Sequence, residues 1–147
     1  MTQATPTAAH VVERLREELE RWPEVLDAYL FGSVARGEAQ PHSDVDVAVF
    51  VEPSALDRPG FGYDAELGAR LQQVLARSDV DVVVLNRAGP VLYHRVLRDG
   101  TRILSRDLAA TTTREGCALS RYCDFLPTLR KVEAIHRQRI ASGNFGR

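Results

Sequence analysis

Cysteines, long apolar runs and repeats are scarce or absent in this sequence, and each absence narrows the class of protein. Two cysteines, Cys117 and Cys123, are too few for a disulfide framework and leave no second pair for zinc. The longest apolar runs are about five to seven residues, far below the roughly 20 that a membrane helix requires. The N-terminal residues have neither the basic segment nor the apolar core of a signal peptide. We therefore expect a cytoplasmic protein that makes no use of a membrane, with both cysteines as small buried or half-buried side chains.

The composition is that of a folded chain with an uneven distribution of charge. Its 147 residues are 44% hydrophobic and 27% charged, so residues 1–147 fit one compact domain with its own core. Residues 1–85 contain 15 acidic and 7 basic side chains, whereas residues 86–147 contain 5 and 12. The basic half could face nucleic acid, nucleotide phosphates or an acidic partner, or could be an ordinary solvated helical surface.

The hydrophobic pattern alternates between helical and strand periods. Valine-rich runs with single acids predict strands, and apolar residues at spacings of three and four predict amphipathic helices. We expect a small mixed sheet with helices packed on it, an α/β (α+β) fold, followed by a helical C-terminus. Pro127 should break or kink that last helix, and residues 142–147 should fray. The expected helices cover about 7–22, 63–77, 90–98 and 107 onward, and the expected strands cover 25–31, 45–51, 80–85 and 101–104.

A glycine–serine pair ends the first expected strand. At such a strand-to-helix turn, Gly32 lets the backbone approach a phosphate, and the Ser33 hydroxyl adds a donor. The N-terminus of the following segment adds exposed N–H groups, and Arg36 is near enough to reach the same anion. By itself, a glycine–serine pair is a common turn.

Two acids, Asp44 and Asp46, lie at the start of the second expected strand, where their side chains share a face. Carboxylates this close repel each other unless a cation lies between them, and oxygen ligands of this kind suit Mg²⁺. A third carboxylate could come from Asp79 or Asp81. We favour Asp81 because strand residues flank it on both sides, which predicts burial; the alternative is an edge position that faces water. Asp81 could then complete a metal shell and accept a proton.

Together these segments resemble the signature of the DNA polymerase β-like nucleotidyltransferase superfamily. Residues 32–37 read Gly-Ser-x-x-Arg-Gly, and residues 43–46 read Ser-Asp-x-Asp. Residues 80–100 and 122–133 are similar to the minimal nucleotidyltransferase (MNT) antitoxins that pair with HEPN toxins. The resemblance implies nucleotide contacts from Gly32, Ser33, Arg36, Gly37 and Ser43, and catalytic metal ligands Asp44, Asp46 and Asp81.

In that branch, ATP and two Mg²⁺ ions serve the transfer of AMP to a tyrosine hydroxyl of a HEPN ribonuclease partner, which is silenced. The resemblance thus implies a hetero-oligomeric complex. The basic helical segment at about 107–147 would serve as a partner-docking extension, and we expect no direct binding of nucleic acid. One departure is Val34, where relatives often carry arginine or another polar residue. It puts one phosphate contact in doubt.

Two other functions stay open. The chain could be a nucleotidyltransferase that acts on an antibiotic or on nucleic acid, although 147 residues leave little room for a substrate domain. It could also be a binding module that occludes its partner without catalysis, which the intact set of acids argues against.

The other polar side chains that stand out in the sequence are weaker candidates for a functional role. Arg130 and His136 resemble the Arg-x5-His motif of HEPN ribonucleases, but those proteins are all-helical, and we interpret the match as chance. We expect His10 and His94 to be polar surface residues. His42 could line the nucleotide site because it lies two residues before Asp44.

Overall fold

The computed structural model, which describes residues 7–35, 44–57, 60 and 62–143, contains one four-stranded mixed sheet. The strand order is β3-β2-β1-β4; β1 pairs antiparallel with β2 and β4, and β2 pairs parallel with β3. This confirms the predicted mixed sheet. The strands are β1 (Val25–Phe31), β2 (Val45–Val51), β3 (Val80–Val84) and β4 (Thr101–Ser105).

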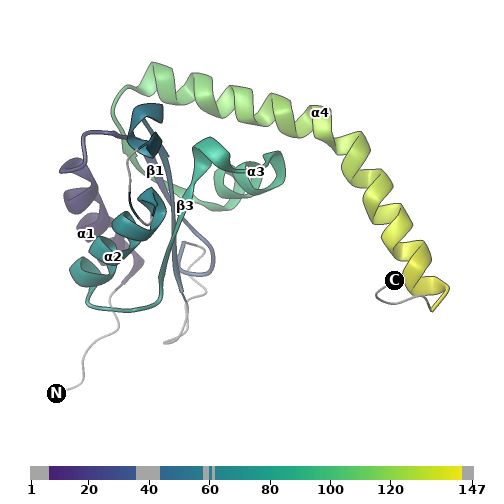
Figure 1. The fold of residues 1–147 in the computed structure, drawn as a ribbon, viewed down its shortest axis with the longest axis horizontal. Helices are drawn as coiled ribbons and strands as arrows, with labels where there is room; N and C mark the ends of the chain where they lie inside the picture. The colour runs from purple at the N-terminus through teal and green to yellow at the C-terminus, as the bar shows by residue number, and fades with distance from the viewer. Residues whose placement is uncertain (1–6, 36–43, 58–59, 61, 144–147) are drawn as a thin grey trace.

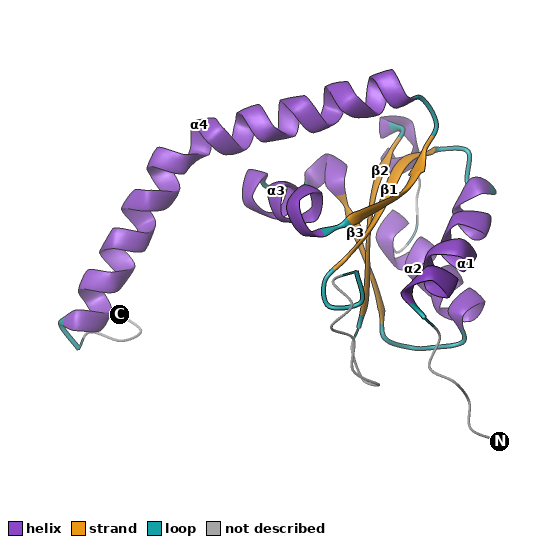
Figure 2. Ribbon diagram, turned by 180° about the vertical axis from the view of Figure 1, so that it is seen from behind, coloured by secondary structure: helices purple, strands orange, loops and turns teal. Residues whose placement is uncertain are grey.

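Helices cover both faces of the sheet. Figures 1 and 2 show α1 and α2 on one side and α3 on the other, with the long α4 passing over the α3 side. The described helices are α1 (Ala8–Glu20), α2 (Tyr63–Leu75), α3 (Pro90–Asp99) and α4 (Leu108–Ala141), with short 3₁₀ turns at Pro53–Asp57 and Leu85–Arg87.

Two hydrophobic clusters hold these layers together. On the α1–α2 side, Val11, Leu15 and Leu19 recur at helical spacing and pack onto β-strand valines that are fully buried. On the α3 side, Ala48 of β2 packs with Tyr93 of α3 and with the other buried residues of that cluster. Because side chains alternate along a strand, residues two positions from Ala48 also point to the α3 side.

Helix α4 has two parts with different surroundings. Its 34 residues begin after Asp107, whose side chain accepts a hydrogen bond from the Ala110 N–H at 3.3 Å, and continue through Pro127. Its two buried residues, Thr111 and Ala118, both lie in the first half. The helix bends about halfway and its second half leads away from the domain (Figure 1). The expected interruption is therefore a bend rather than a break.

Both cysteines are exposed on α4, so the prediction that they are buried or half-buried is wrong. Cys117 and Cys123 occupy parts of the helix surface that face solvent, because the packed face is the one that carries Thr111 and Ala118. Within the described part of the chain, no helix combines the length and apolar character needed to cross a membrane.

Candidate functional site

The candidate site lies where one end of the sheet brings three strands together. The antiparallel register sets Phe31, at the end of β1, opposite Asp46 in β2. The parallel register sets Asp46 beside Asp81 in β3. The turn after β1 and the acids at the start of β2 and β3 therefore meet at the same end of the sheet, as the sequence predicts.

Gly32 makes direct contact between the turn and the acids possible. Its φ of +79° lies in the left-handed region that favours glycine. A Cβ at this position would overlap the Oδ2 atom of Asp46 and lie 3.3 Å from its Cγ. Glycine is therefore favoured here for two reasons: the backbone conformation and the lack of space for a side chain beside Asp46. Ser33 follows in the turn and is half-buried.

The acids form an electrostatically unfavourable group. Asp46 is half-buried, while Asp44 and Asp81 are exposed. Burial, and then the charges of Asp81 and Asp44, raise the pKa of Asp46 above its ordinary value. A cation between these carboxylates would relieve both costs. In the described residues, however, no three acidic, histidine or cysteine side chains converge closely enough to hold a metal ion as they stand. The acids are nevertheless near enough for the charges of Asp81 and Asp44 to act on Asp46.

An ion pair separates the roles of Asp79 and Asp81. The Arg77 Nε and Nη2 atoms donate to the two carboxylate oxygens of Asp79, each at 2.5 Å. The backbone carbonyl of Asp79 accepts the N–H of Val45 at 2.8 Å. Asp79 is therefore engaged on its side chain and its backbone, whereas Asp81 lies directly beside Asp46. The geometry favours Asp81 as the third carboxylate.

The reason given for Asp81 from the sequence is nevertheless wrong. Asp81 is exposed rather than buried, because β3 is an edge strand of the described sheet. Its nearness to Asp46 comes from strand pairing, which the sequence pattern alone does not specify.

Several predicted site residues cannot be placed. Arg36, Gly37, His42 and Ser43 lie outside the described residues. Val34 is 5% exposed and belongs to the hydrophobic cluster under α1 and α2, so its apolar character serves the core.

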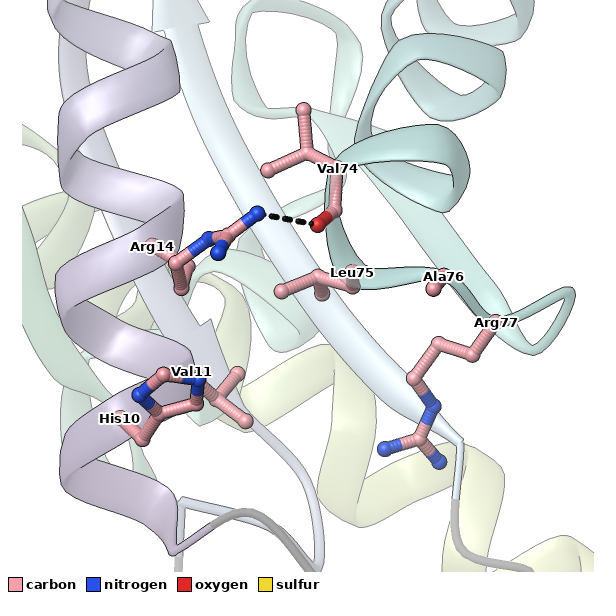
Figure 3. A pocket seen from close by; sticks show the side chains of 7 residues that line it. All are labelled: His10, Val11, Arg14, Val74, Leu75, Ala76 and Arg77. Carbon is pink, nitrogen blue, oxygen red and sulfur yellow. Dashed lines mark hydrogen bonds between the residues drawn. The ribbon is translucent and has the colours of Figure 1, made fainter.

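Sequence reasoning missed Arg77, whose only signal was its position two residues before Asp79. Besides binding Asp79, Arg77 is attracted by Asp44, and its pKa is raised chiefly by the hydrogen bonds to Asp79. It also borders a pocket of about 190 Å³ between α1 and the end of α2. Figure 3 shows that His10 and Arg14 reach this pocket from α1 and that Arg14 donates to the Val74 carbonyl, at 2.9 Å. None of the three acids Asp44, Asp46 and Asp81 lines this pocket.

The other histidines are not gathered at this edge. His10 is exposed, as expected. His94 is half-buried and stacks on Tyr122 of α4, with ring centroids 3.7 Å apart, so it joins α3 to α4 rather than simply facing water. Arg130 and His136 are both exposed on α4, far along the chain from the acids.

The family model described as "Polymerase beta, Nucleotidyltransferase" matches residues 13–109. The chain therefore belongs to this nucleotidyltransferase family, and the expected superfamily is confirmed. The particular resemblance is to the protein adenylyltransferase MntA of Shewanella oneidensis, which is 33% identical over 93 residues. This match covers 63% of the present chain and 61% of MntA, less than two thirds of that relative.

Solved structures share the fold. A toxin–antitoxin crystal structure with AMP-PNP has a TM-score of 0.60 at 23% identity, covering 89% of this chain and 96% of its own. A tri-AMPylated Shewanella oneidensis HEPN toxin in complex with an MNT antitoxin gives 0.58 at 23% identity, covering 86% and 96%. These likenesses confirm the predicted fold class, and α4 of this chain is the predicted helical C-terminus.

Proposed function

We propose that this chain is a Mg²⁺-dependent adenylyltransferase antitoxin, acting in the cytoplasm, that transfers AMP from ATP to a tyrosine hydroxyl of a cognate HEPN ribonuclease. The observation that carries the proposal is the meeting of Asp46, Asp81 and Gly32 at one sheet edge, with Asp44 just before β2. Membership of the nucleotidyltransferase family and the similarity to MntA support it.

The reaction exchanges one bond to phosphorus for another. The tyrosine oxygen forms a bond to the α-phosphorus of ATP, and the bond from that phosphorus to the bridging oxygen breaks. Pyrophosphate leaves with the bond electrons, and the tyrosine proton passes to a carboxylate oxygen of Asp81. Products and reactants then balance without any further reagent.

We assign the site residues the following roles in this reaction. Gly32 and Ser33 would bind the triphosphate, and Arg36, Gly37 and Ser43 stay predicted contacts. Asp44, Asp46 and Asp81 would hold Mg²⁺, which fits their mutual repulsion and supplies charge neutralisation for the attacking and leaving oxygens. The partner brings the acceptor hydroxyl, so a small chain needs no substrate domain of its own.

Pyrophosphate release tests this function. With ATP, Mg²⁺ and the HEPN protein, we expect release that stops when the partner's acceptor tyrosines are replaced by phenylalanine. The double variant Asp44→Asn/Asp46→Asn should release none while keeping the native circular dichroism spectrum. Full release by that variant would refute the role of the carboxylates.

A further inference from the structure

We call the second half of α4, residues 126–141, the distal segment. Figures 1 and 2 show it leading away from the sheet and from α1, α2 and α3. Every residue from 130 to 141 is exposed. Val132, Ile135 and Ile140 expose 56%, 51% and 46% of their surface, which is unusual for large apolar side chains on one helix.

The packed face of α4 continues into the distal segment. Ala118, which seats the first half on the domain, lies eleven residues before Leu129, or about three helical turns. Leu129, Val132, His136 and Ile140 then follow at spacings of three and four, which places them along one side of a helix. Val132 and His136 line a shallow hollow of about 430 Å³ together with Glu133 and Arg137. An apolar stripe thus runs past the point where the domain stops covering it.

The distal segment carries more positive charge than the first half of the helix, and two of its arginines, Arg137 and Arg139, lie three residues from members of the stripe. Residues 108–125 contain two basic and two acidic side chains, whereas residues 126–141 contain four basic and one acidic. The basic residues of the distal segment are Arg130, Lys131, Arg137 and Arg139.

The distal segment also lies on the side of the candidate site. It descends on the α3 side of the sheet (Figure 1). Asp46 points to the same side, because it lies two residues before Ala48, which packs against α3. A protein bound to the distal segment would therefore lie on the side of the sheet to which Asp46 points.

We propose that the distal segment is the docking surface for the HEPN partner and that it receives an apolar helix face flanked by acidic side chains. The inference rests on the proposed function for the identity of the partner. A second copy of this chain fits the surface poorly, since pairing two distal segments would bring their arginines and lysine together. Docking there would hold the acceptor tyrosine near the site at a high effective concentration.

Binding of the HEPN protein by isothermal titration calorimetry tests the surface directly. Val132→Glu/Ile140→Glu places charge on the stripe, and we expect it to weaken binding by about 100-fold or more, as loss of a central apolar anchor does. Arg137→Glu/Arg139→Glu should weaken binding and reduce its salt dependence. The matched controls are Leu108→Glu, an equally exposed apolar residue at the other end of α4, and Arg95→Glu, an exposed arginine of α3. Both controls should bind like the unaltered chain.

Each outcome separates docking from catalysis. In transfer assays, the stripe variant should show a raised KM for the partner with little change in kcat, and circular dichroism should show that α4 is intact. Unaltered affinity of the stripe variant, or no binding by the unaltered chain, would overturn the docking proposal even if AMP is transferred. Loss of binding in the stripe variant but no transfer by the unaltered chain would leave docking standing and refute the proposed function. A dimer of this chain that the stripe substitutions dissociate would make a second copy the occupant, which also overturns the proposal.

Discussion

At the scale of single residues, the site depends on how closely a turn and an acid approach each other. Because Gly32 has no side chain, the carboxylate of Asp46 can lie against it. Burial and the neighbouring negative charges raise the pKa of that carboxyl. The carboxylates at this end of the sheet are therefore electrostatically unfavourable on their own, and a bound cation would stabilise them. Substitutions here should therefore affect catalysis first and stability second.

Gly32→Ala should reduce transfer by at least about 10-fold, because the new Cβ forces either the turn or the Asp46 side chain to move. The strained backbone should also lower the free energy of unfolding by about 1–3 kcal/mol. Transfer rates and urea denaturation measure the two effects. Gly89→Ala is the control, since no atom lies within 4 Å of its added Cβ. Equal activity of the two variants would contradict the close approach.

Asp81→Asn and Asp79→Asn should differ in kind. Asp81→Asn should slow transfer by about 100-fold or more through loss of a ligand and proton acceptor, with stability kept because the side chain is exposed. Asp79→Asn should instead weaken the pair with Arg77 and lower stability while transfer still requires Mg²⁺. Rates over a Mg²⁺ titration distinguish them. The reverse pattern would make Asp79 the third carboxylate.

At the scale of elements, buried and half-buried ion pairs fix the helices on the sheet. Asp27 of β1 is fully buried and accepts hydrogen bonds from Arg114 of α4 at 2.7 and 2.9 Å and from Thr111 at 2.5 Å. On the other face, Glu18 of α1 accepts a hydrogen bond from Arg70 of α2 at 2.8 Å. The first pair anchors α4, and the second joins the two helices that cover the opposite face.

Asp27→Leu should lower the free energy of unfolding by about 3–5 kcal/mol, because it leaves the Arg114 guanidinium without its buried partner. The hydrogen exchange of backbone amides should rise first in the first half of α4, residues 108–125. Arg98→Ala, which removes an exposed pair with Asp99, is the control and should leave the free energy of unfolding nearly unchanged. A loss below about 1 kcal/mol for Asp27→Leu would show that α4 is held by apolar contacts alone.

Arg70→Met should have an effect that depends on pH. The hydrogen bond from Arg70 lowers the pKa of Glu18 from its ordinary value of 4.5. A lowered carboxyl pKa stabilises the folded state above pH 4.5, and the stabilisation is lost as pH falls through the folded pKa. Arg70 is exposed to solvent, which screens the pair, so we expect only a small loss of stability at pH 7. Urea denaturation at pH 7 and below pH 4.5 measures the free energy of unfolding of the unaltered chain and of Arg70→Met, and we expect the difference between them to shrink in acid. A difference that stays constant with pH would show that Arg70 acts through packing.

At the scale of the whole molecule, local patterns predicted the elements and long-range pairing decided their surroundings. The strands Val25–Phe31 and Val45–Val51 match the expected ranges, because each is a short run of β-favouring apolar residues interrupted by a single acid. The exposure of Asp81 depends on β3 being an edge, and that of Cys117 depends on which side of α4 meets the sheet. Both follow from contacts distant in sequence. The pairing of Asp46 with Asp81 likewise needed the strand order.

Intact-mass spectrometry of the HEPN partner tests the central claim most directly. After incubation with this chain, ATP and Mg²⁺, the partner should gain one or more AMP units, and it should gain none with Asp44→Asn/Asp46→Asn. A partner that forms a stable complex but keeps its original mass would contradict adenylyl transfer and make this chain an occluding module.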